Sequence, residues 1–175
     1  MDKEWGKLAL RLLAASKDDI GPILSGVDRD RGDRGILKIP EEMVNQRWRE
    51  IVLEMAQGKL EDYQVSFRDN EIHVEAQVKM LVRTRLHLVF RIKEFAFSPK
   101  GRNIVLSYET VGTSLANPFV PKVLEMAANK IPELVMVQGK DLHFLLNSVE
   151  EIPPWLAVKY RGTKDGVLEV AFLIV

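Results

Sequence analysis

The clearest pattern in the chain is an alternation of apolar and polar residues that runs from Ile72 to Ile92. Apolar side chains occupy the even positions, while Glu, His, Gln, Lys and Arg fill most of the odd positions. A period of two is typical of a β-strand with one buried face. A two-residue hairpin inside the segment would reverse the parity, and the parity does not reverse. The pattern favours one unusually long, bent strand, with two strands joined by an odd-length connection as the alternative.

A hairpin is predicted directly before this segment. Residues 63–67 alternate in the same way, and Asp69-Asn70 is a typical two-residue turn. This turn sets three cross-strand pairs, each apolar on both sides: Phe67 with Ile72, Val65 with Val74, and Tyr63 with Ala76.

Two further hairpins are expected, and the first of them follows a change of parity. The alternation reverses at Lys93-Glu94, where we expect a β-bulge. A turn over residues 99–102 would then place Phe97 opposite Ile104 and Phe95 opposite Leu106. A final turn over 162–166 would pair Leu156, Val158 and Tyr160 with Phe172, Val170 and Leu168.

Helical periodicity appears in three segments, 3–16, 40–57 and 118–131. Residues 25–38 contain charges of alternating sign and no apolar period, which is typical of a solvated loop or linker. Residues 134–137 and 142–146 flank a Gly-Lys-Asp turn and predict another hairpin. We therefore divide the chain into an N-terminal helix with a charged loop, 1–35, and a single α+β domain, 36–175.

Composition narrows the function classes. Lys plus Arg equals Asp plus Glu at 25 each, which argues against a general nucleic-acid binder. The chain has no cysteine, so disulfides and thiol catalysis are excluded. No apolar run reaches the ~18 residues of a transmembrane helix, and residues 1–20 do not read as a signal peptide. A cytoplasmic protein is the expectation, with export left open if the chain has been trimmed.

No catalytic motif is present, and neither an enzyme nor a cofactor is predicted. His73 and His87 both lie on the polar side of the alternating segment, and the third histidine, His143, lies far along the chain. A metal site needs three or four convergent ligands, and the sequence supplies two candidates. We therefore predict surface histidines and no metal site.

The two sides of the alternating segment frame the functional question. Its polar side carries basic residues that could contact phosphate headgroups, or that simply form the solvated outer face of a sheet. These residues are Lys79, Arg83, Arg85, Arg91 and Lys93. Its apolar side either forms a packed core with the 118–131 helix or leaves an apolar groove.

A family resemblance favours the groove. It rests on residues 39–45, on 134–142 and on 164–170, together with the long alternating strands, the Pro-flanked helix and the Pro-Pro break at 153–154. In this order, they resemble the small bacterial tubular lipid-binding (TULIP-like) domains over residues 36–175. The resemblance implies an α+β fold in which a long, curved antiparallel sheet wraps around a central helix, here with additional N-terminal helices.

The resemblance also implies non-enzymatic binding of a lipid or another apolar ligand. The expected groove residues are Val78, Met80, Val82, Leu86, Leu88, Phe90, Leu106, Val120, Leu124 and Ile131. The alternative is a structural or protein-interaction module with a fully packed core, which uses its basic strand face or a sheet edge. Peripheral membrane contact and a homodimer through an exposed edge are both compatible with the pattern.

Overall fold

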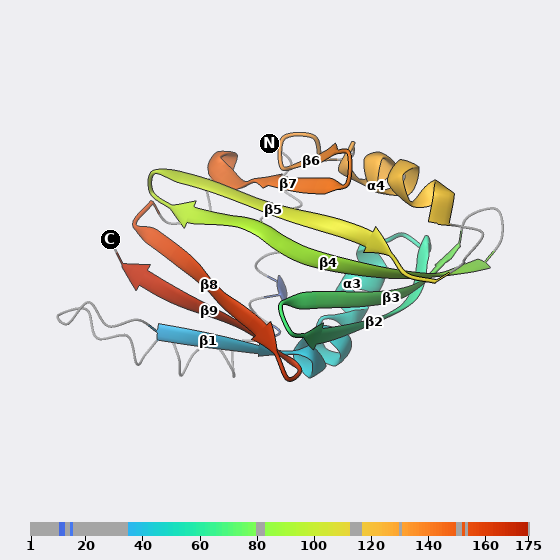
Figure 1. Cartoon of the computed structure of the whole chain (residues 1–175), viewed down its shortest axis with the longest axis horizontal. Coiled ribbons are helices and arrows are strands. Elements are labelled where there is room, and N and C mark those ends of the chain that lie inside the picture. The colour runs from blue at the N-terminus through green and yellow to red at the C-terminus, as the bar shows by residue number, and fades with distance from the viewer. Residues whose placement is uncertain are drawn as a thin grey trace.

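The structure, a computed structural model, describes residues 11, 12, 15, 35–79, 83–112, 117–129, 131–149, 152 and 154–174. This part of the chain consists mostly of two antiparallel sheets with few helices, so the α+β class holds in its coarse form (Figure 1). Residues 11, 12 and 15 are helical, and the rest of the predicted helix at 3–16 and residues 16–34 lie outside the described residues. No helix of the described residues is long and apolar enough to cross a membrane.

The larger sheet has six strands in the order β2-β3-β4-β5-β7-β6. Its strands are β2 (Leu60–Arg68), β3 (Glu71–Lys79), β4 (Arg83–Ser98), β5 (Gly101–Thr110), β6 (Val135–Gln138) and β7 (Asp141–Leu145). The smaller sheet has three strands in the order β1-β9-β8. Its strands are β1 (Gly35–Pro40), β8 (Leu156–Lys164) and β9 (Val167–Ile174).

The prediction of one long strand over 72–92 is wrong. The segment is a hairpin, in which β3 pairs antiparallel with β4 and Lys79 lies opposite Arg83. Three residues, 80–82, separate the two strands and lie outside the described residues. A three-residue connection preserves the parity of the alternation, because even-numbered residues then lie opposite even-numbered residues and odd-numbered residues opposite odd-numbered ones. The alternative of two strands with an odd-length connection is therefore correct.

The predicted hairpin turn at Asp69-Asn70 is confirmed, with all three apolar pairs in the predicted register. The bulge is confirmed as well, since the register of β4 against β5 shifts between Ile92 and Glu94. The other two registers are wrong by two residues. Phe95 lies opposite Ile104 and Val158 lies opposite Phe172, because both turns are two-residue loops rather than longer ones.

Strand β1 corrects the prediction of a loop or linker at 25–38 for residues 35–38, whereas residues 25–34 lie outside the described residues. Leu37 lies opposite Val170 and Ile39 lies opposite Leu168, so the start of the 36–175 segment is an edge strand of the smaller sheet. Leu37 and Ile39 do alternate with exposed residues, but a strand this short is obscured by the charged stretch before it.

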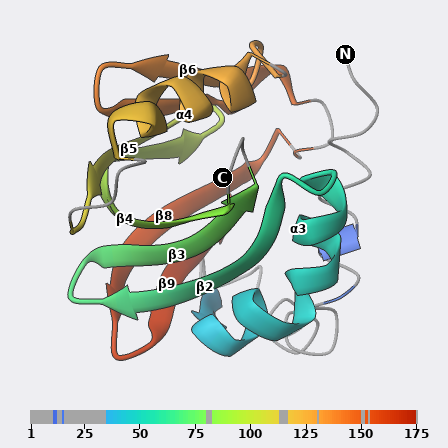
Figure 2. The ribbon, with the colours of Figure 1, turned by 90° about the vertical axis from the view of Figure 1, so that its right-hand side faces the viewer.

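Helical elements lie against one side of the six-stranded sheet. A π-helical turn, η1 (Met43–Arg47), leads into α3 (Arg49–Met55), and a 3₁₀ turn, η2 (Asn117–Phe119), leads into α4 (Val120–Ala128). A second 3₁₀ turn, η3 (Leu146–Ser148), follows β7. Figure 2 shows α3 beside β2 and α4 beside β6, well apart from each other. Pro121 near the start of α4 suits a first helical turn.

The three-stranded sheet packs against the same apolar side. The Tyr160 ring of β8 stacks on the Phe95 ring of β4, with ring centroids 6.0 Å apart. The two hairpin ends also join through their backbones. The Asn70 N–H donates to the Thr163 carbonyl at 2.8 Å, and the Gly166 N–H donates to the Phe67 carbonyl at 3.0 Å. The core is therefore shared by the six-stranded sheet, the helices and the smaller sheet.

Candidate functional site

The apolar face of the six-stranded sheet contains five of the ten predicted groove residues. Under α4, a buried cluster is formed by Leu86, Leu88, Tyr108, Val120 and Leu142. Val78, Phe90, Leu106 and Leu124 pack partly buried against it. Ile131 is half-buried just beyond α4, and Met80 and Val82 lie outside the described residues. The structure thus brings eight of the predicted residues to the α4 side of the molecule, and three of them, Leu86, Leu88 and Val120, already fill the core.

Part of this face is less well covered. Phe90, Ile92, Phe95 and Leu106, here named the apolar strip, lie side by side on β4 and β5, with Ile92 opposite Leu106. All four side chains are half-buried although they belong to central strands. Phe90 and Leu106 border the buried cluster, whereas Phe95 contacts Tyr160 of the smaller sheet. The apolar strip therefore lies between α4 and β8.

The opposite part of the apolar face, over β2 and β3, is closed by residues 41–55. Tyr63, Val65 and Phe67 are buried there against Val44, Val52 and Leu53. Asn45 is buried, and its side chain both donates to the Val65 carbonyl and accepts from the Val65 N–H, each at 2.7 Å. These bonds satisfy the outer backbone groups of an edge strand.

Neighbouring side chains complete the closure of this edge. The Phe67 N–H donates to a Glu41 carboxylate oxygen at 3.0 Å, and Arg49 donates to the Tyr63 carbonyl at 3.0 Å. The Tyr63 hydroxyl donates to the Val44 carbonyl at 2.6 Å. The pKa of Tyr63 is raised by burial, so this hydroxyl keeps its proton at neutral pH. Strand addition at β2 is therefore blocked, and the other edge of this sheet is β6.

The basic residues lie on the opposite, polar face of the sheet, and carboxylates of neighbouring strands pair with several of them. Arg83 Nε lies 3.0 Å from Glu61, and Lys93 Nζ lies 2.7 Å from Asp141. Arg91 pairs with both Glu71 and Glu109. Lys79 and Arg85 are exposed on the same face. The predicted basic surface is thus a mixed surface in which charges of both signs alternate.

The same face holds a network around two histidines. His73 Nδ1 lies 3.1 Å from His87 Nε2, and His73 Nε2 lies 2.9 Å from Glu71 Oε2. Arg91 donates to the other Glu71 oxygen at 2.6 and 2.9 Å. The hydrogen bonds from Arg91, and then that from His73, lower the pKa of Glu71 below its ordinary value. Glu71 is therefore a carboxylate at neutral pH.

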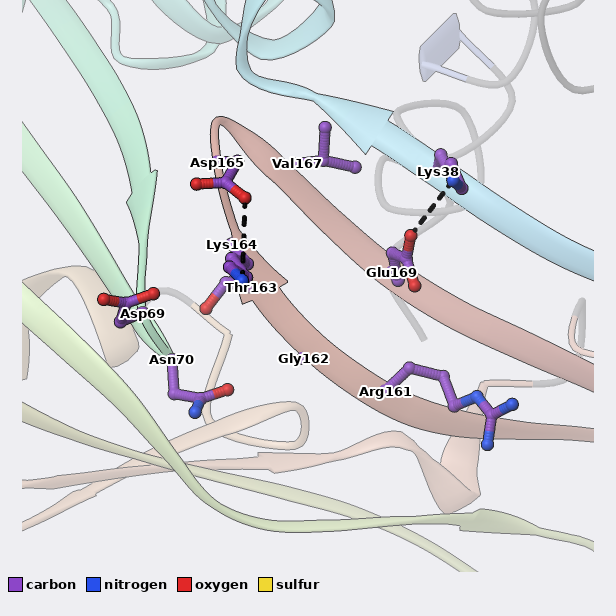
Figure 3. Close-up of a pocket in the computed structure, with 10 residues that line it drawn as sticks. All are labelled: Lys38, Asp69, Asn70, Arg161, Gly162, Thr163, Lys164, Asp165, Val167 and Glu169. Carbon is purple, nitrogen blue, oxygen red and sulfur yellow. Dashed lines mark ion pairs between the residues drawn. The ribbon is translucent and has the colours of Figure 1, made fainter.

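A polar pocket of about 440 Å³ lies where the two hairpin ends meet (Figure 3). Charged side chains of both signs line it: Lys38, Arg161 and Lys164 with Asp69, Asp165 and Glu169. Two of the cations pair within it, Lys38 with Glu169 at 3.3 Å and Lys164 with Asp165 at 3.9 Å. An apolar ligand would desolvate these charges at a cost, so this pocket is not the predicted groove.

Sequence reasoning missed the closure of the β2 edge, the polar pocket and the proximity of the two histidines. The pocket depends on a contact between segments about ninety residues apart, which no local pattern encodes. His73 and His87 were recognised as sharing a face, and the β3–β4 register then decides that they touch, since Glu75 lies opposite His87.

No protein-family model matches the chain, and neither a curated protein nor a solved structure is significantly similar to it.

Proposed function

We propose that the protein binds a lipid or another apolar molecule against the apolar strip, between α4 and β8, without catalysing a reaction. The observation that carries this proposal is the half-burial of Phe90, Ile92, Phe95 and Leu106 on central strands of the sheet. Apolar surface on a central strand is normally covered, and uncovered surface lowers stability by about 25 cal/mol per Å². An alkyl chain lying along the strip would contribute about 0.8 kcal/mol for each buried methylene.

The wider groove predicted from the sequence belongs to this proposal. In it, the six-stranded sheet curves around α4 as the central helix, and the half-buried Val78, Leu124 and Ile131 extend the ligand surface from the strip. Leu86, Leu88 and Val120 form its floor.

The basic residues do not contact the headgroup of such a ligand, because Arg83, Arg91 and Lys93 lie on the opposite face. A membrane surface would meet them from outside, as a peripheral contact. Ligand binding and surface contact are therefore separable by mutation.

Native mass spectrometry of the full chain, purified without detergent, tests the proposal directly. We expect bound lipid that is lost in Ile92→Trp, because the larger ring fills the space beside Leu106. Met136→Trp is the matched control, since Met136 is 44% exposed on the edge strand β6 and lies away from the strip. A wild-type protein that carries no lipid, and takes up none from vesicles of phosphatidylethanolamine and phosphatidylglycerol, would refute the proposal.

A second candidate function is a protein-interaction module, favoured by one observation. Phe119, just before α4, and Met126, on the outside of α4, lie seven residues apart and are 56% and 52% exposed. Spacing of seven places two residues on one helix face. If this second function is correct, Phe119→Ser with Met126→Ser would abolish partner capture or dimerisation and leave lipid binding intact. Ile92→Trp would abolish lipid binding and leave partner capture or dimerisation intact.

A further inference from the structure

The pairing of β3 with β4 places two imidazoles in contact on the polar face. Glu75 lies directly opposite His87, and His73 lies two residues before Glu75, so the two rings meet diagonally across the hairpin. Their centroids are 5.3 Å apart, and His73 Nδ1 lies 3.1 Å from His87 Nε2. The side chain of His73 is only 14% exposed, so its position is set by its surroundings.

Glu71 determines which nitrogen of His73 is free to act as an acceptor. Its carboxylate lies 2.9 Å from His73 Nε2, so Nε2 carries the proton and donates a hydrogen bond to Glu71. Nδ1 then directs its lone pair toward His87. A carboxylate that holds the far nitrogen of a histidine is the arrangement that orients histidine ligands in metal sites. Arg91 holds Glu71 in turn, through a contact of 2.6 Å, and Glu109 pairs with Arg91 at 3.0 Å.

The spacing of the two nitrogens matches a coordination site. Two imidazole nitrogens bound to a tetrahedral zinc ion at about 2.0–2.1 Å are separated by about 3.3 Å. The observed 3.1 Å differs from this by a few tenths of an ångström, which a small side-chain rotation supplies. A metal ion can therefore replace the hydrogen bond between the rings if His87 moves its proton from Nε2 to Nδ1.

We propose that His73 and His87 bind a divalent transition-metal ion through His73 Nδ1 and His87 Nε2, with Glu75 as the third ligand. Imidazole nitrogen with one carboxylate suits Zn²⁺, Ni²⁺ and Cu²⁺. Among the described residues, no three His, Asp or Glu side chains already converge on one point. Glu75 is exposed on the same face and opposite His87, so a rotation of its side chain supplies the third oxygen, and water completes the coordination.

Isothermal titration calorimetry of the chelator-stripped full chain with Zn²⁺, Ni²⁺ and Cu²⁺ tests the site. We expect one ion per chain, no binding of Mg²⁺, and loss of binding in His73→Asn and in His87→Asn. Glu71→Gln should weaken binding by about 10–100-fold, because the Nε2 proton loses its carboxylate partner. Glu75→Gln should weaken binding without abolishing it.

His143→Asn is the matched control, because His143 lies on β7, on the same polar face but two strands from β4. It should bind the ion as the wild type does. A thermal melt verifies folding, and imidazole NMR signals of the wild-type protein test the site without mutation, since Zn²⁺ should shift those of His73 and His87 but not that of His143. No binding by the wild type, unchanged binding in His73→Asn with His87→Asn, or a shift of His143 alone would overturn the proposal.

Discussion

The two helical covers of the apolar face are attached in different ways. Residues 41–55 are tied to β2 by hydrogen bonds from Asn45, Tyr63 and Arg49, several of them to backbone groups. The contacts of Val120 and Leu124 that hold α4 to the sheet are apolar.

This difference assigns different roles to the two sides of the core. Directional hydrogen bonds to buried backbone groups are costly to break, whereas apolar contacts can be exchanged for contacts with another apolar surface. The β2 side is therefore the fixed part of the fold. The α4 side can exchange sheet contacts for ligand contacts, and it lies next to the apolar strip.

Asn45→Ala should have the largest effect on stability, because it leaves the Val65 N–H and carbonyl buried without partners. We expect a loss of about 3 kcal/mol in the free energy of unfolding, measured by urea denaturation. Gln46→Ala is the control, since Gln46 is exposed on the same turn and should change stability by less than about 0.5 kcal/mol. A loss below about 1 kcal/mol for Asn45→Ala would remove the distinction between the two covers.

Val120→Ala should weaken the attachment of α4 alone. Val120 is 1% exposed, so removing two methyl groups should cost about 2 kcal/mol. Hydrogen exchange should accelerate in residues 120–128 and stay unchanged in 41–55. Met126→Ala, on the exposed side of the same helix, should change neither the free energy of unfolding nor the rate of hydrogen exchange in residues 120–128. Equal acceleration in both segments would show that the two covers respond as one unit.

Gly162→Ala tests the junction between the two sheets. Gly162 has a φ of 145° at the β8 bulge, and an added Cβ would lie 3.3 Å from the Asn70 side-chain oxygen. We expect a loss of about 1 kcal/mol in thermal or urea unfolding, from backbone strain and this close contact. Gly101→Ala is the control, because nothing lies within 4 Å of its added Cβ. Equal stability of the two variants would contradict this account of the junction.

The smallest effect is expected on the polar face, which neither helix covers. The folded-state pKa of Glu71 is lowered by Arg91 and His73, so its contribution to stability is present above the unfolded value near 4.5. That contribution is lost as the pH falls below 4.5 and through the folded-state pKa. Glu71→Gln should therefore reduce the fall in melting temperature between pH 5 and about pH 3. The control is Glu50→Gln, which removes an exposed carboxylate of α3. Its melting temperature should fall over this pH range as much as that of the wild type.

Local turn chemistry explains which registers could be predicted. Asn70 has a φ of 61°, which asparagine tolerates, so Asp69-Asn70 forms the expected two-residue turn. Gly162 and Gly101 suggested longer turns at the other two hairpins. Instead, Asp165 and Gly166 adopt the positive φ values of a tight turn, and Gly162 occupies a bulge within β8.

The sequence by itself determined the two faces of the large sheet, the hairpin at 69–70 and the bulge at Ile92–Glu94, because side-chain parity and turn preferences are local properties. Only the tertiary structure decided that residues 72–92 form two strands, because a three-residue connection leaves the parity unchanged. It also decided that Asn45 closes β2 and that His73 touches His87. Those contacts depend on how distant segments pack, and the sequence of any one segment does not determine that packing.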